Sequence, residues 1–385
     1  MRIVHLCLGS FFPDNYSYQE NMLPKFHKQQ GNHVEVIASL ATFDENGKPT
    51  YMEHGGTYQN EYDIKVTRLE YRKPLKIYHR MKRYIGTYAA LEAAKPEILF
   101  IHGCQFMDMD IVVRYLKKHA GIRVYVDNHA DFSNSATNWL SKNILHKIFW
   151  RHTAQMVEPY TTKFYGVLPA RVDFLKNLYK LPPEKCELLV MGADDDLVEA
   201  AEKPEVRREI RSKYRIAEDD FLIMTGGKID QFKTQTLLLM EAVQKIKNPK
   251  VKLIVFGSIT TDLKEKVNAL ADGEKVQSIG WIQAKDSYQY FAAADLVVFP
   301  GRHSVFWEQV AAQGIPMLCK KWDGTTHVDV GGNVGFLEKD SADEIQEKIQ
   351  ELLNQPEKYQ QMKRVAVEQG KKTFLYSDIA KRCIT

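Results

Sequence analysis

The stretch that decides the fold is Phe299–Leu318, with the sequence FPGRHSVFWEQVAAQGIPML. It predicts a strand, a loop, a short helix and a second strand. The apolar run 295–299 is the first strand, and residues 305–313 fit about two helical turns. Gly314 suits the left-handed position after a helix, and Pro316 cannot continue the helix. A strand, loop, helix and strand in this order form the repeating unit of a parallel sheet.

The same stretch predicts an anion site. A loop that leaves the carboxyl end of a parallel strand directs the free amides of the next helix to the sheet edge, where they and the helix dipole favour an anion. Ser304 is a candidate cap for this helix. Glu308 lies one turn inside it, where its carboxylate can accept hydrogen bonds from two neighbouring hydroxyls, such as those of a ribose. The alternative is that Glu308 is an ordinary solvated helix residue.

Length and composition limit the class of protein. With 385 residues, 44% of them hydrophobic, the chain can form two domains with sizeable cores. Its 53 basic and 49 acidic residues nearly balance, which is not a nucleic-acid signature. No apolar run reaches about 18 residues, and the chain begins directly with a strand, so we expect neither export nor a membrane span. We expect a cytoplasmic protein that could lie on the inner face of the cell membrane.

The five cysteines are far apart and form no C-x-x-C pair. This argues against a zinc site or a disulfide framework and fits a reduced cytosol. Three of them, Cys7, Cys104 and Cys319, lie in or beside apolar runs, which predicts core positions.

Strands and helices alternate along the whole chain, which predicts an α/β protein with doubly wound parallel sheets. In the first half we expect strands at 3–8, 33–38, 98–101 and 123–127, a polar excursion at 41–63, and helices at 17–30, 78–94, 110–119 and within 137–158. In the second half we expect strands at 221–225, 252–256, 276–279, 296–299 and 315–319, and helices within 341–369.

The charged segment 194–219 marks the junction between two domains. We place the first domain at residues 1–200 and the second at 201–370. The short tail 371–385 is expected to pack back on the first domain.

The second domain opens with residues 225–233, TGGKIDQFK. Two glycines after a strand, Gly226 and Gly227, let the backbone approach a ligand closely. Lys228 and Lys233 lie five apart across a loop, so both can converge on one phosphate. The alternative is a plain strand–helix turn with two solvated lysines. The chain has neither a Walker A motif nor a G-x-G-x-x-G after its first strand, which disfavours a nicotinamide dinucleotide.

Four motifs in order carry a resemblance to a known family. They are GGK-x4-K at 226–233, GWI at 280–282, AADLVV-x-P at 293–300 and E-x5-GIP at 308–316. This order resembles the donor domain of GT-B retaining glycosyltransferases of family GT4. The first half is similar in its Gly9 loop, its stretch 31–36 and its stretch 190–194. The resemblance implies two Rossmann-like domains that face each other across a cleft.

The resemblance implies roles in the second domain. Lys228 and Lys233 would hold the donor diphosphate and neutralise the leaving phosphate, with Gly227 beside them. The first lysine is more often arginine in the family. Glu308 would bind the donor ribose, and Ile282 would present its backbone to the nucleobase.

In the first domain, the resemblance places Gly9 near the donor phosphates and His129 near the donor sugar. Asp127 and Asp131 flank this histidine and could orient its ring. The alternative is that His129 is a loop histidine that caps a turn.

The chain departs from the family at one position. The family has an earlier glutamate, eight residues before the one that binds ribose, and Pro300 occupies that position here. The loop carries His303, Ser304 and Val305 instead, so we expect a different polar set to bind the sugar.

The implied reaction needs no metal. Two lysines and a helix N-terminus can stabilise a diphosphate leaving group. The triplet Asp108-Met109-Asp110 has the spacing of metal-dependent sugar transferases, but the sequence favours a helix start there. The retaining family implies attack on the face that the nucleotide leaves, with the leaving phosphate taking the proton of the acceptor. We therefore expect no cofactor and no metal, with the nucleotide-sugar as substrate.

The acceptor side is indicated by residues 71–84, which hold six Lys or Arg and no acid. Lys76, Arg80 and Arg83 fall on one side of the expected helix, and aromatic residues are interleaved with them. This mixture suits an anionic membrane surface or a lipid diphosphate. Residues 139–151 form a second such stretch. The alternative is a solvated helix face packed on the domain.

The sequence thus predicts a hexosyltransferase that uses a nucleotide-sugar, a UDP-sugar above others, to build a cell-surface polysaccharide or glycolipid. Two other classes stay open. A nucleotide-sugar 2-epimerase has the same architecture, and so would a non-catalytic GT-B binding protein.

Overall fold

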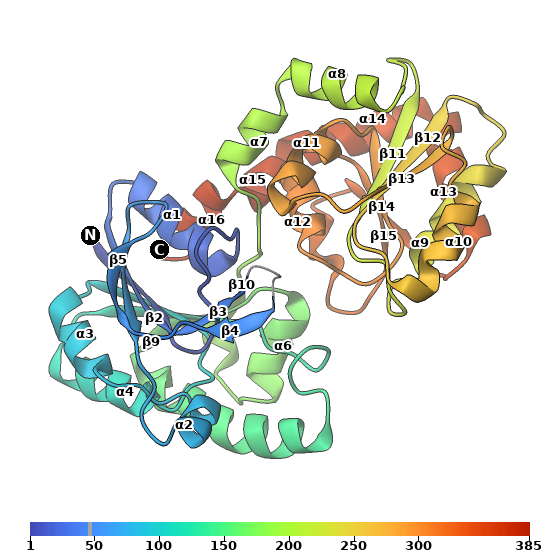
Figure 1. Ribbon diagram of the computed structural model, residues 1–385. Coiled ribbons are helices and arrows are strands. Elements are labelled where there is room, and N and C mark those ends of the chain that lie inside the picture. The colour runs from blue at the N-terminus through green and yellow to red at the C-terminus, as the bar shows by residue number, and fades with distance from the viewer. Residues whose placement is uncertain (45–47) are drawn as a thin grey trace. The chain divides into compact units, whose positions relative to one another are not determined.

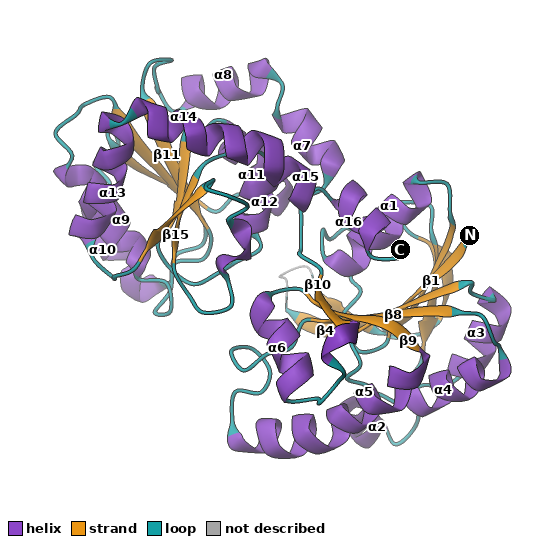
Figure 2. Ribbon diagram, turned by 180° about the vertical axis from the view of Figure 1, so that it is seen from behind, coloured by secondary structure: helices purple, strands orange, loops and turns teal. Residues whose placement is uncertain are grey.

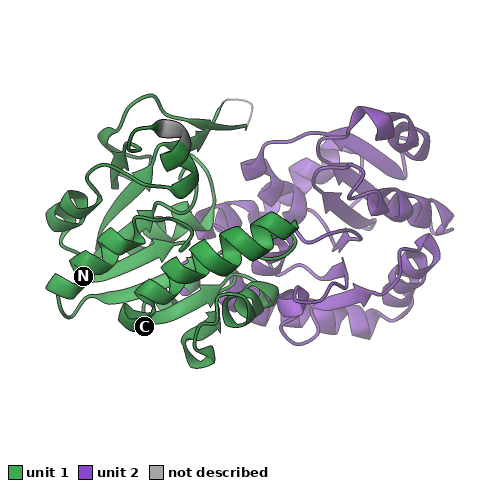
Figure 3. Cartoon of the chain, turned by 90° about the horizontal axis from the view of Figure 1, so that it is seen from below, with its two compact units in different colours: residues 1–190, 379–385 green, residues 191–378 purple. Residues whose placement is uncertain are grey.

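The structure is a computed structural model that describes residues 1–44 and 48–385 (Figure 1). It divides into two compact units (Figure 3). Unit 1 comprises Met1–Val190 and Ile379–Thr385, and unit 2 comprises Met191–Asp378. The sequence predicted the first boundary at residue 200, ten residues after the observed one, and the second at residue 370, eight residues before the observed one.

Unit 1 is built on an eight-stranded sheet with the strand order β10-β9-β8-β7-β1-β2-β6-β5. Every neighbouring pair is parallel except β5 and β6. The strands are β1 (Arg2–Cys7), β2 (His33–Ser39), β5 (Gly56–Gln59), β6 (Lys65–Leu69), β7 (Ile98–His102), β8 (Arg123–Asn128), β9 (Thr161–Gly166) and β10 (Cys186–Leu188). The central strands are buried on both faces, as their continuous apolar runs predict.

Helices cover both faces of this sheet, with α3, α4 and α5 on one side and α1 and α16 on the other (Figure 2). The helices are α1 (Gln19–Gln29), α2 (Leu75–Met81), α3 (Thr87–Ala94), α4 (Met109–Lys118), η1 (Ser141–Trp150), α5 (Arg151–Val157), η2 (Glu158–Tyr160), α6 (Pro169–Asn177), η3 (Pro183–Lys185) and α16 (Tyr376–Arg382). The chain returns to unit 1 within α16.

Two expectations for unit 1 are wrong. The single helix at 78–94 is two helices, because Lys82 and Gly86 adopt left-handed backbone (φ 51° and 88°) and Tyr84 pairs with Tyr71 as a short bridge. The excursion 41–63 contains strands: β3 (Ala41–Phe43) pairs with β4 (Pro49–Tyr51), and β5 extends the main sheet. The apolar pattern of 78–94 does not reveal this break, because Tyr84 is buried although it lies between the two helices.

Unit 2 is built on a six-stranded, fully parallel sheet with the order β13-β12-β11-β14-β15-β16. The strands are β11 (Phe221–Gly226), β12 (Val251–Phe256), β13 (Val276–Gly280), β14 (Leu296–Phe299), β15 (Met317–Lys320) and β16 (Val334–Leu337). The order reverses at β11, so the neighbouring carboxyl ends of β11 and β14 form the crevice where such sheets bind ligands.

Helices sandwich this second sheet, with α9, α10 and α13 on one face and α11 and α12 on the other (Figure 2). The helices are α7 (Asp195–Ala201), α8 (Pro204–Lys213), α9 (Gln235–Lys245), η4 (Thr261–Leu263), α10 (Lys264–Leu270), η5 (Ala284–Asp286), α11 (Ser287–Ala292), α12 (Phe306–Ala312), η6 (Thr326–Val328), α13 (Ala342–Asn354), α14 (Pro356–Val365), η7 (Ala366–Gly370) and α15 (Lys371–Phe374).

Residues 296–320 fold as β14, a loop, α12 and β15. Gly314 has the expected left-handed backbone (φ 69°). The cap is different: α12 begins after Val305, and no side chain caps it, so Ser304 does not have that role. All five cysteines are buried and unpaired, as predicted for three of them. Within the described residues, no helix combines the length and the apolar character that a membrane crossing needs.

Candidate functional site

A hollow lies at the carboxyl edge of the second sheet. It is lined by residues that follow β11 and β14, together with the ends of those strands and of β12. The lining residues are Thr225, Gly226, Gly227, Lys228, Ile229, Lys233, Thr236, Val255, Phe256, Phe299, Pro300, Gly301, Arg302 and Ser304. Four of the predicted donor-binding residues, Gly227, Lys228, Lys233 and Ser304, therefore share one hollow.

Glycine is required where the loops of this hollow meet. Gly257, which follows β12, has φ 135°, and a Cβ atom there would lie 1.8 Å from the Gly227 carbonyl oxygen. A Cβ atom on Gly226 would lie 2.2 Å from the ring of Phe256. The loop that carries Lys228 is therefore held against its neighbour by close backbone contact, including the hydrogen bond from the Gly227 amide to the Phe256 carbonyl.

The two lysines differ in their environments. Lys233 is partly buried, and its Nζ lies 3.9 Å from the position of a Cβ atom on Gly227. Burial lowers the pKa of Lys233, with Asp230 opposing the shift. The Lys228 side chain is 62% exposed and lies 3.4 Å from the Asp230 carboxylate. Lys233 is thus the lysine that is fixed inside the hollow.

The hollow contains a third cationic side chain, for which the sequence predicted no role. Arg302 lines the hollow, and its guanidinium lies 5.3 Å from the centre of the Phe232 ring. Its position between a strand end and a helix start could have marked it as a candidate phosphate ligand.

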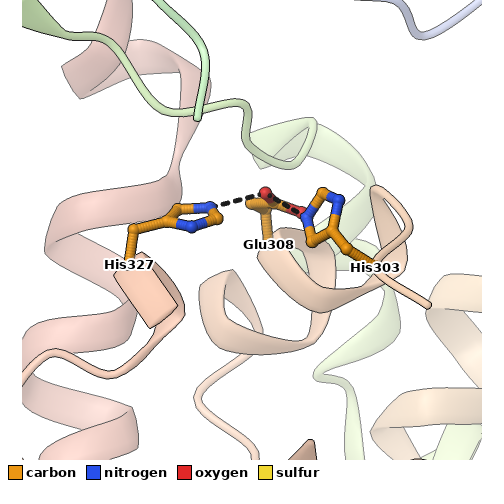
Figure 4. A group of neighbouring side chains, drawn as sticks. All are labelled: His303, Glu308 and His327. Carbon is orange, nitrogen blue, oxygen red and sulfur yellow. Dashed lines mark hydrogen bonds and ion pairs between the residues drawn. The ribbon is translucent and has the colours of Figure 1, made fainter. Parts of the chain in front are cut away.

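Glu308 lies in a group of three side chains (Figure 4). Its Oε1 atom is 2.8 Å from the Nε2 atoms of both His303 and His327. Glu308 is fully buried, and burial would raise its pKa, but the two imidazoles outweigh burial and lower the pKa to about 2. Its other oxygen, Oε2, has no hydrogen-bond partner within residues 1–44 and 48–385. Glu308 is therefore a buried carboxylate with one oxygen available, and not a solvated helix residue.

These three side chains also have the composition of a metal site, since one ligand atom from each lies within 4.8 Å of the others. Ligands at about 2.0–2.1 Å around a tetrahedral zinc lie roughly 3.3 Å apart. Here both imidazoles point at the same oxygen at hydrogen-bond distance. The geometry fits two donors that share one acceptor better than three ligands spaced around an ion.

The remaining predicted donor residues lie outside the lining of the hollow. His303 faces Glu308, and Val305 precedes the first turn of α12. Ile282 follows β13, beside Trp281, whose side chain is exposed. The structure thus brings His303 to Glu308 and leaves the role of Ile282 untested. His327 was not predicted, because it comes from the short helix η6, 19 residues along the chain.

In unit 1, His129 follows β8 at the carboxyl edge of the first sheet. Its Nε2 atom is 3.6 Å from the Asp127 carboxylate and has no hydrogen-bond partner in the described part of the chain. Burial would lower the pKa of His129, but the charges of Glu20 and Asp127 outweigh it and raise the pKa. Asp131 does not orient the ring as expected, since it binds Arg171 and Ser133.

Gly9 is held by contacts within its own unit. A Cβ atom there would lie 2.8 Å from the Gly103 carbonyl oxygen, and the Gly9 carbonyl accepts a hydrogen bond from Lys82. Burial lowers the pKa of Lys82 to about 8. The glycine therefore allows two strand-end loops to pack closely.

The basic stretch 71–84 is only partly available to a ligand. Arg80 is exposed, but Arg83 forms ion pairs with Asp110 (2.6 Å) and Asp108 (3.3 Å). The Lys76 side chain lies outside the described residues. Asp108 immediately precedes α4, and its carboxylate accepts hydrogen bonds from the Tyr84 amide and the Thr87 hydroxyl. The helix start predicted for Asp108-Met109-Asp110 is confirmed.

Comparisons with known proteins agree with this description. Residues 206–369 match a family model described as glycosyl transferases group 1. No curated protein matches the chain.

Solved structures with low sequence identity share the fold. HepE (Alr3699) from Anabaena, solved with UDP, is 14% identical with a TM-score of 0.67, and the alignment covers 99% of this chain and 98% of that one. A glycosyltransferase from Rickettsia africae is 14% identical with a TM-score of 0.69, over 99% and 96%. A UDP-GlcNAc 2-epimerase from Neisseria meningitidis, bound to UDP-GlcNAc, is 13% identical with a TM-score of 0.64, over 99% and 98%. Two Rossmann-like units with these neighbours constitute the GT-B fold.

Proposed function

We propose that this chain, which has the GT-B fold and whose residues 206–369 match the model of glycosyl transferases group 1, transfers a sugar from a UDP-sugar to a glycan or lipid-linked acceptor. The transfer retains the anomeric configuration and requires no metal. Its product belongs to a cell-surface polysaccharide or glycolipid.

The observation that carries this proposal is the hollow of unit 2. It joins a glycine loop, Lys233, Lys228 and Arg302 at the carboxyl edge of a parallel sheet. This is the place and the charge that a nucleoside diphosphate requires. The solved neighbour HepE binds UDP, and its fold is shared by this chain.

The chemistry follows from charge. When the bond between the sugar carbon and the diphosphate oxygen breaks, negative charge develops on the leaving phosphate. Lys233 and Lys228 line the hollow and stabilise this negative charge. Because the charge on the leaving phosphate is larger in the transition state than in the bound donor, the two lysines stabilise the transition state more. The acceptor hydroxyl attacks on the face that the nucleotide leaves, and its proton passes to the leaving phosphate.

The Glu308 carboxylate is suited to bind the ribose. His303 and His327 both donate to Oε1, which keeps the carboxylate ionised and fixes its plane. Oε2 then accepts from the ribose hydroxyls, which would satisfy a buried oxygen that otherwise has no partner in the described residues. His129, with its unpartnered Nε2 atom, contacts the sugar in this proposal.

The test is nucleotide release from a panel of UDP-, GDP- and ADP-sugars, first without added metal and then with EDTA. We expect slow hydrolysis of a UDP-sugar that EDTA does not change. Release that EDTA abolishes would contradict metal-independent transfer and would favour metal binding by His303, Glu308 and His327. An isomerised sugar still attached to its nucleotide would identify an epimerase. Tight UDP binding without turnover on any acceptor would identify a non-catalytic binding protein.

A lipid-linked acceptor is supported by helix η1 and the segment before it. No acid occurs between Asp131 and Glu158. Trp139, Leu140 and Ile148 expose 71%, 57% and 57% of their surface. Exposed apolar side chains among basic ones favour the surface of an anionic membrane.

We therefore expect the protein to co-sediment with vesicles that contain anionic lipid at low salt. The double variant Lys142→Glu/Lys147→Glu should lower the bound fraction at least tenfold, because each basic residue near such a surface contributes about 1 kcal/mol. The matched control is Lys264→Glu/Lys266→Glu, which makes the same change of charge on unit 2 at two exposed lysines. Equal sedimentation of the two variants would contradict docking through η1.

A further inference from the structure

A chain of buried imidazoles runs from Asp127 to the C-terminal helix. His102 Nδ1 lies 2.8 Å from Asp127 Oδ2, and His102 Nε2 lies 2.9 Å from His5 Nδ1. His5 Nε2 lies 3.0 Å from His27 Nδ1, and His27 Nε2 lies 2.8 Å from the Ala380 carbonyl oxygen. This row of imidazoles thus links strands β8, β7 and β1 to helices α1 and α16. The two helices lie beside each other (Figures 1 and 2).

Water does not reach these groups. His5, His27, His102 and Asp127 are all fully buried. Burial lowers the pKa of His5 well below its usual range and lowers that of His27 to about 4. Both rings are therefore neutral at pH 7, and each carries one proton on its two nitrogens.

The number of protons decides the charge of the remaining ring. Four contacts connect Asp127, three imidazoles and Ala380, and each hydrogen bond needs one proton. Three neutral imidazoles supply three protons, so one contact would join two lone pairs at hydrogen-bond distance. Such a contact, buried and without a shared proton, is strongly unfavourable because neither lone pair is compensated. The chain therefore needs a fourth proton.

The carbonyl at the far end fixes where this proton lies. Ala380 O can only accept, so His27 donates from Nε2 and accepts at Nδ1. His5 must then donate from Nε2 and accept at Nδ1, and His102 must donate from Nε2. The fourth proton lies between His102 Nδ1 and Asp127 Oδ2. The Gly103 amide donates to the other oxygen of Asp127 at 3.0 Å, which favours the ionised carboxylate.

We propose that His102 is a permanent buried imidazolium, locked by His5, His27 and the Ala380 carbonyl, and that it positions the Asp127 carboxylate beneath His129. A neutral His102 could adopt either tautomer, and in one of them it would not donate a hydrogen bond to Asp127. The locked cation fixes Asp127 and lessens the pull of its charge on His129. The mechanistic part of this inference rests on the proposed role of His129.

The charged and titratable groups around His102 are few. The imidazole chain itself contains His5 from β1, Asp127 from β8 and His27 from α1, and the Sγ atom of Cys383, next to α16, lies 3.6 Å from His27 Nε2 and 3.3 Å from the Ala380 carbonyl oxygen. His129, Cys7 and Cys104 interact electrostatically with Asp127, and Glu20 from α1 interacts with His129 and Cys7. Burial raises the pKa of the Cys383 thiol beyond the physiological range, so it stays neutral. Asp127, which is in direct contact with His102, offsets its positive charge.

The experiment is long-range proton–nitrogen NMR of the full chain with ¹⁵N-labelled histidine, which distinguishes an imidazolium from both neutral tautomers. We expect one imidazolium at pH 8.5, which disappears in His102→Gln and so is assigned. His27→Gln should keep it, because the glutamine amide can donate to Ala380 O while its oxygen accepts from His5. His27→Leu should abolish it, because the shortened chain then needs no fourth proton.

Two outcomes would overturn the proposal: three neutral imidazoles in the wild type at pH 8.5, or an imidazolium that persists in His27→Leu. Both are read without turnover, so they are independent of the proposed function. If the donor is turned over, the acidic limb of the rate profile, set by His129, should rise by roughly one pH unit in His27→Leu and not in His27→Gln. An equal profile in the two variants would contradict the positioning role.

Discussion

Lys233→Ala should lower kcat/KM for the sugar donor by about 10³-fold while the protein keeps its fold. The ammonium group lies in the hollow of unit 2 beside the Gly227 backbone. It meets charge that develops as the phosphate leaves, and the loss of one such donor typically costs 10²–10³-fold in rate. Because burial already lowers the pKa of Lys233, alanine removes a desolvation cost and should not destabilise unit 2. The measurement is donor hydrolysis under single-turnover conditions, with circular dichroism to verify folding.

Lys228→Ala is the matched control. Lys228 belongs to the same loop, but its side chain is 62% exposed and faces Asp230. Since solvent screens this charge, we expect a loss of about tenfold. If both variants lost the same activity, the fixed position of Lys233 would not explain its effect. If Lys233→Ala kept more than a tenth of the wild-type rate, the hollow would not hold the leaving phosphate.

The second sheet was largely predictable, because parallel strands buried on both faces are continuous apolar runs. The expected strands at 221–225, 252–256 and 296–299 agree with β11, β12 and β14 to within one residue. The glycine–lysine loop followed from its position after β11. Hydrophobic periodicity could not predict the break at 82–86. Left-handed backbone at Lys82 and Gly86 interrupts the helix there, while the apolar pattern continues across the break.

The partners of the site residues were less predictable than the residues. Glu308 and His303 lie five residues apart, but His327 reaches the same oxygen from the helix η6. His5 and His102 lie in strands and His27 in a helix, and each alone resembles an ordinary core histidine. Only the parallel register of β1 and β7 and the packing of α1 bring their nitrogens together. Contacts between side chains from distant elements depend on the tertiary fold, so the local sequence pattern cannot predict them.

Gly257→Ala should reduce donor turnover by about 100-fold although Gly257 does not line the hollow. An added Cβ atom would lie 1.8 Å from the Gly227 carbonyl oxygen and 2.6 Å from its carbon. Real Cβ atoms essentially never come closer than 3.0 Å, so the loop that carries Lys228 must move by about 1 Å. A displacement of that size at a positioning group can cost about 10²-fold in rate. The measurements are donor hydrolysis and the dissociation constant of UDP.

The change also introduces a side chain at φ 135°, so backbone strain must be separated from the steric effect. Gly273→Ala provides the separation, because Gly273 has φ 77° and a Cβ atom there has no atom of the described residues within 4 Å. It should cost about 1–2 kcal/mol of stability, as a left-handed residue does, and leave turnover within about twofold. If Gly257→Ala lost stability but turned over donor like Gly273→Ala, the contact between the two glycine loops would support the fold without positioning the phosphate. A selective loss of UDP affinity in Gly257→Ala would instead show that the position of the loop that carries Gly227 and Lys228 is required for donor binding.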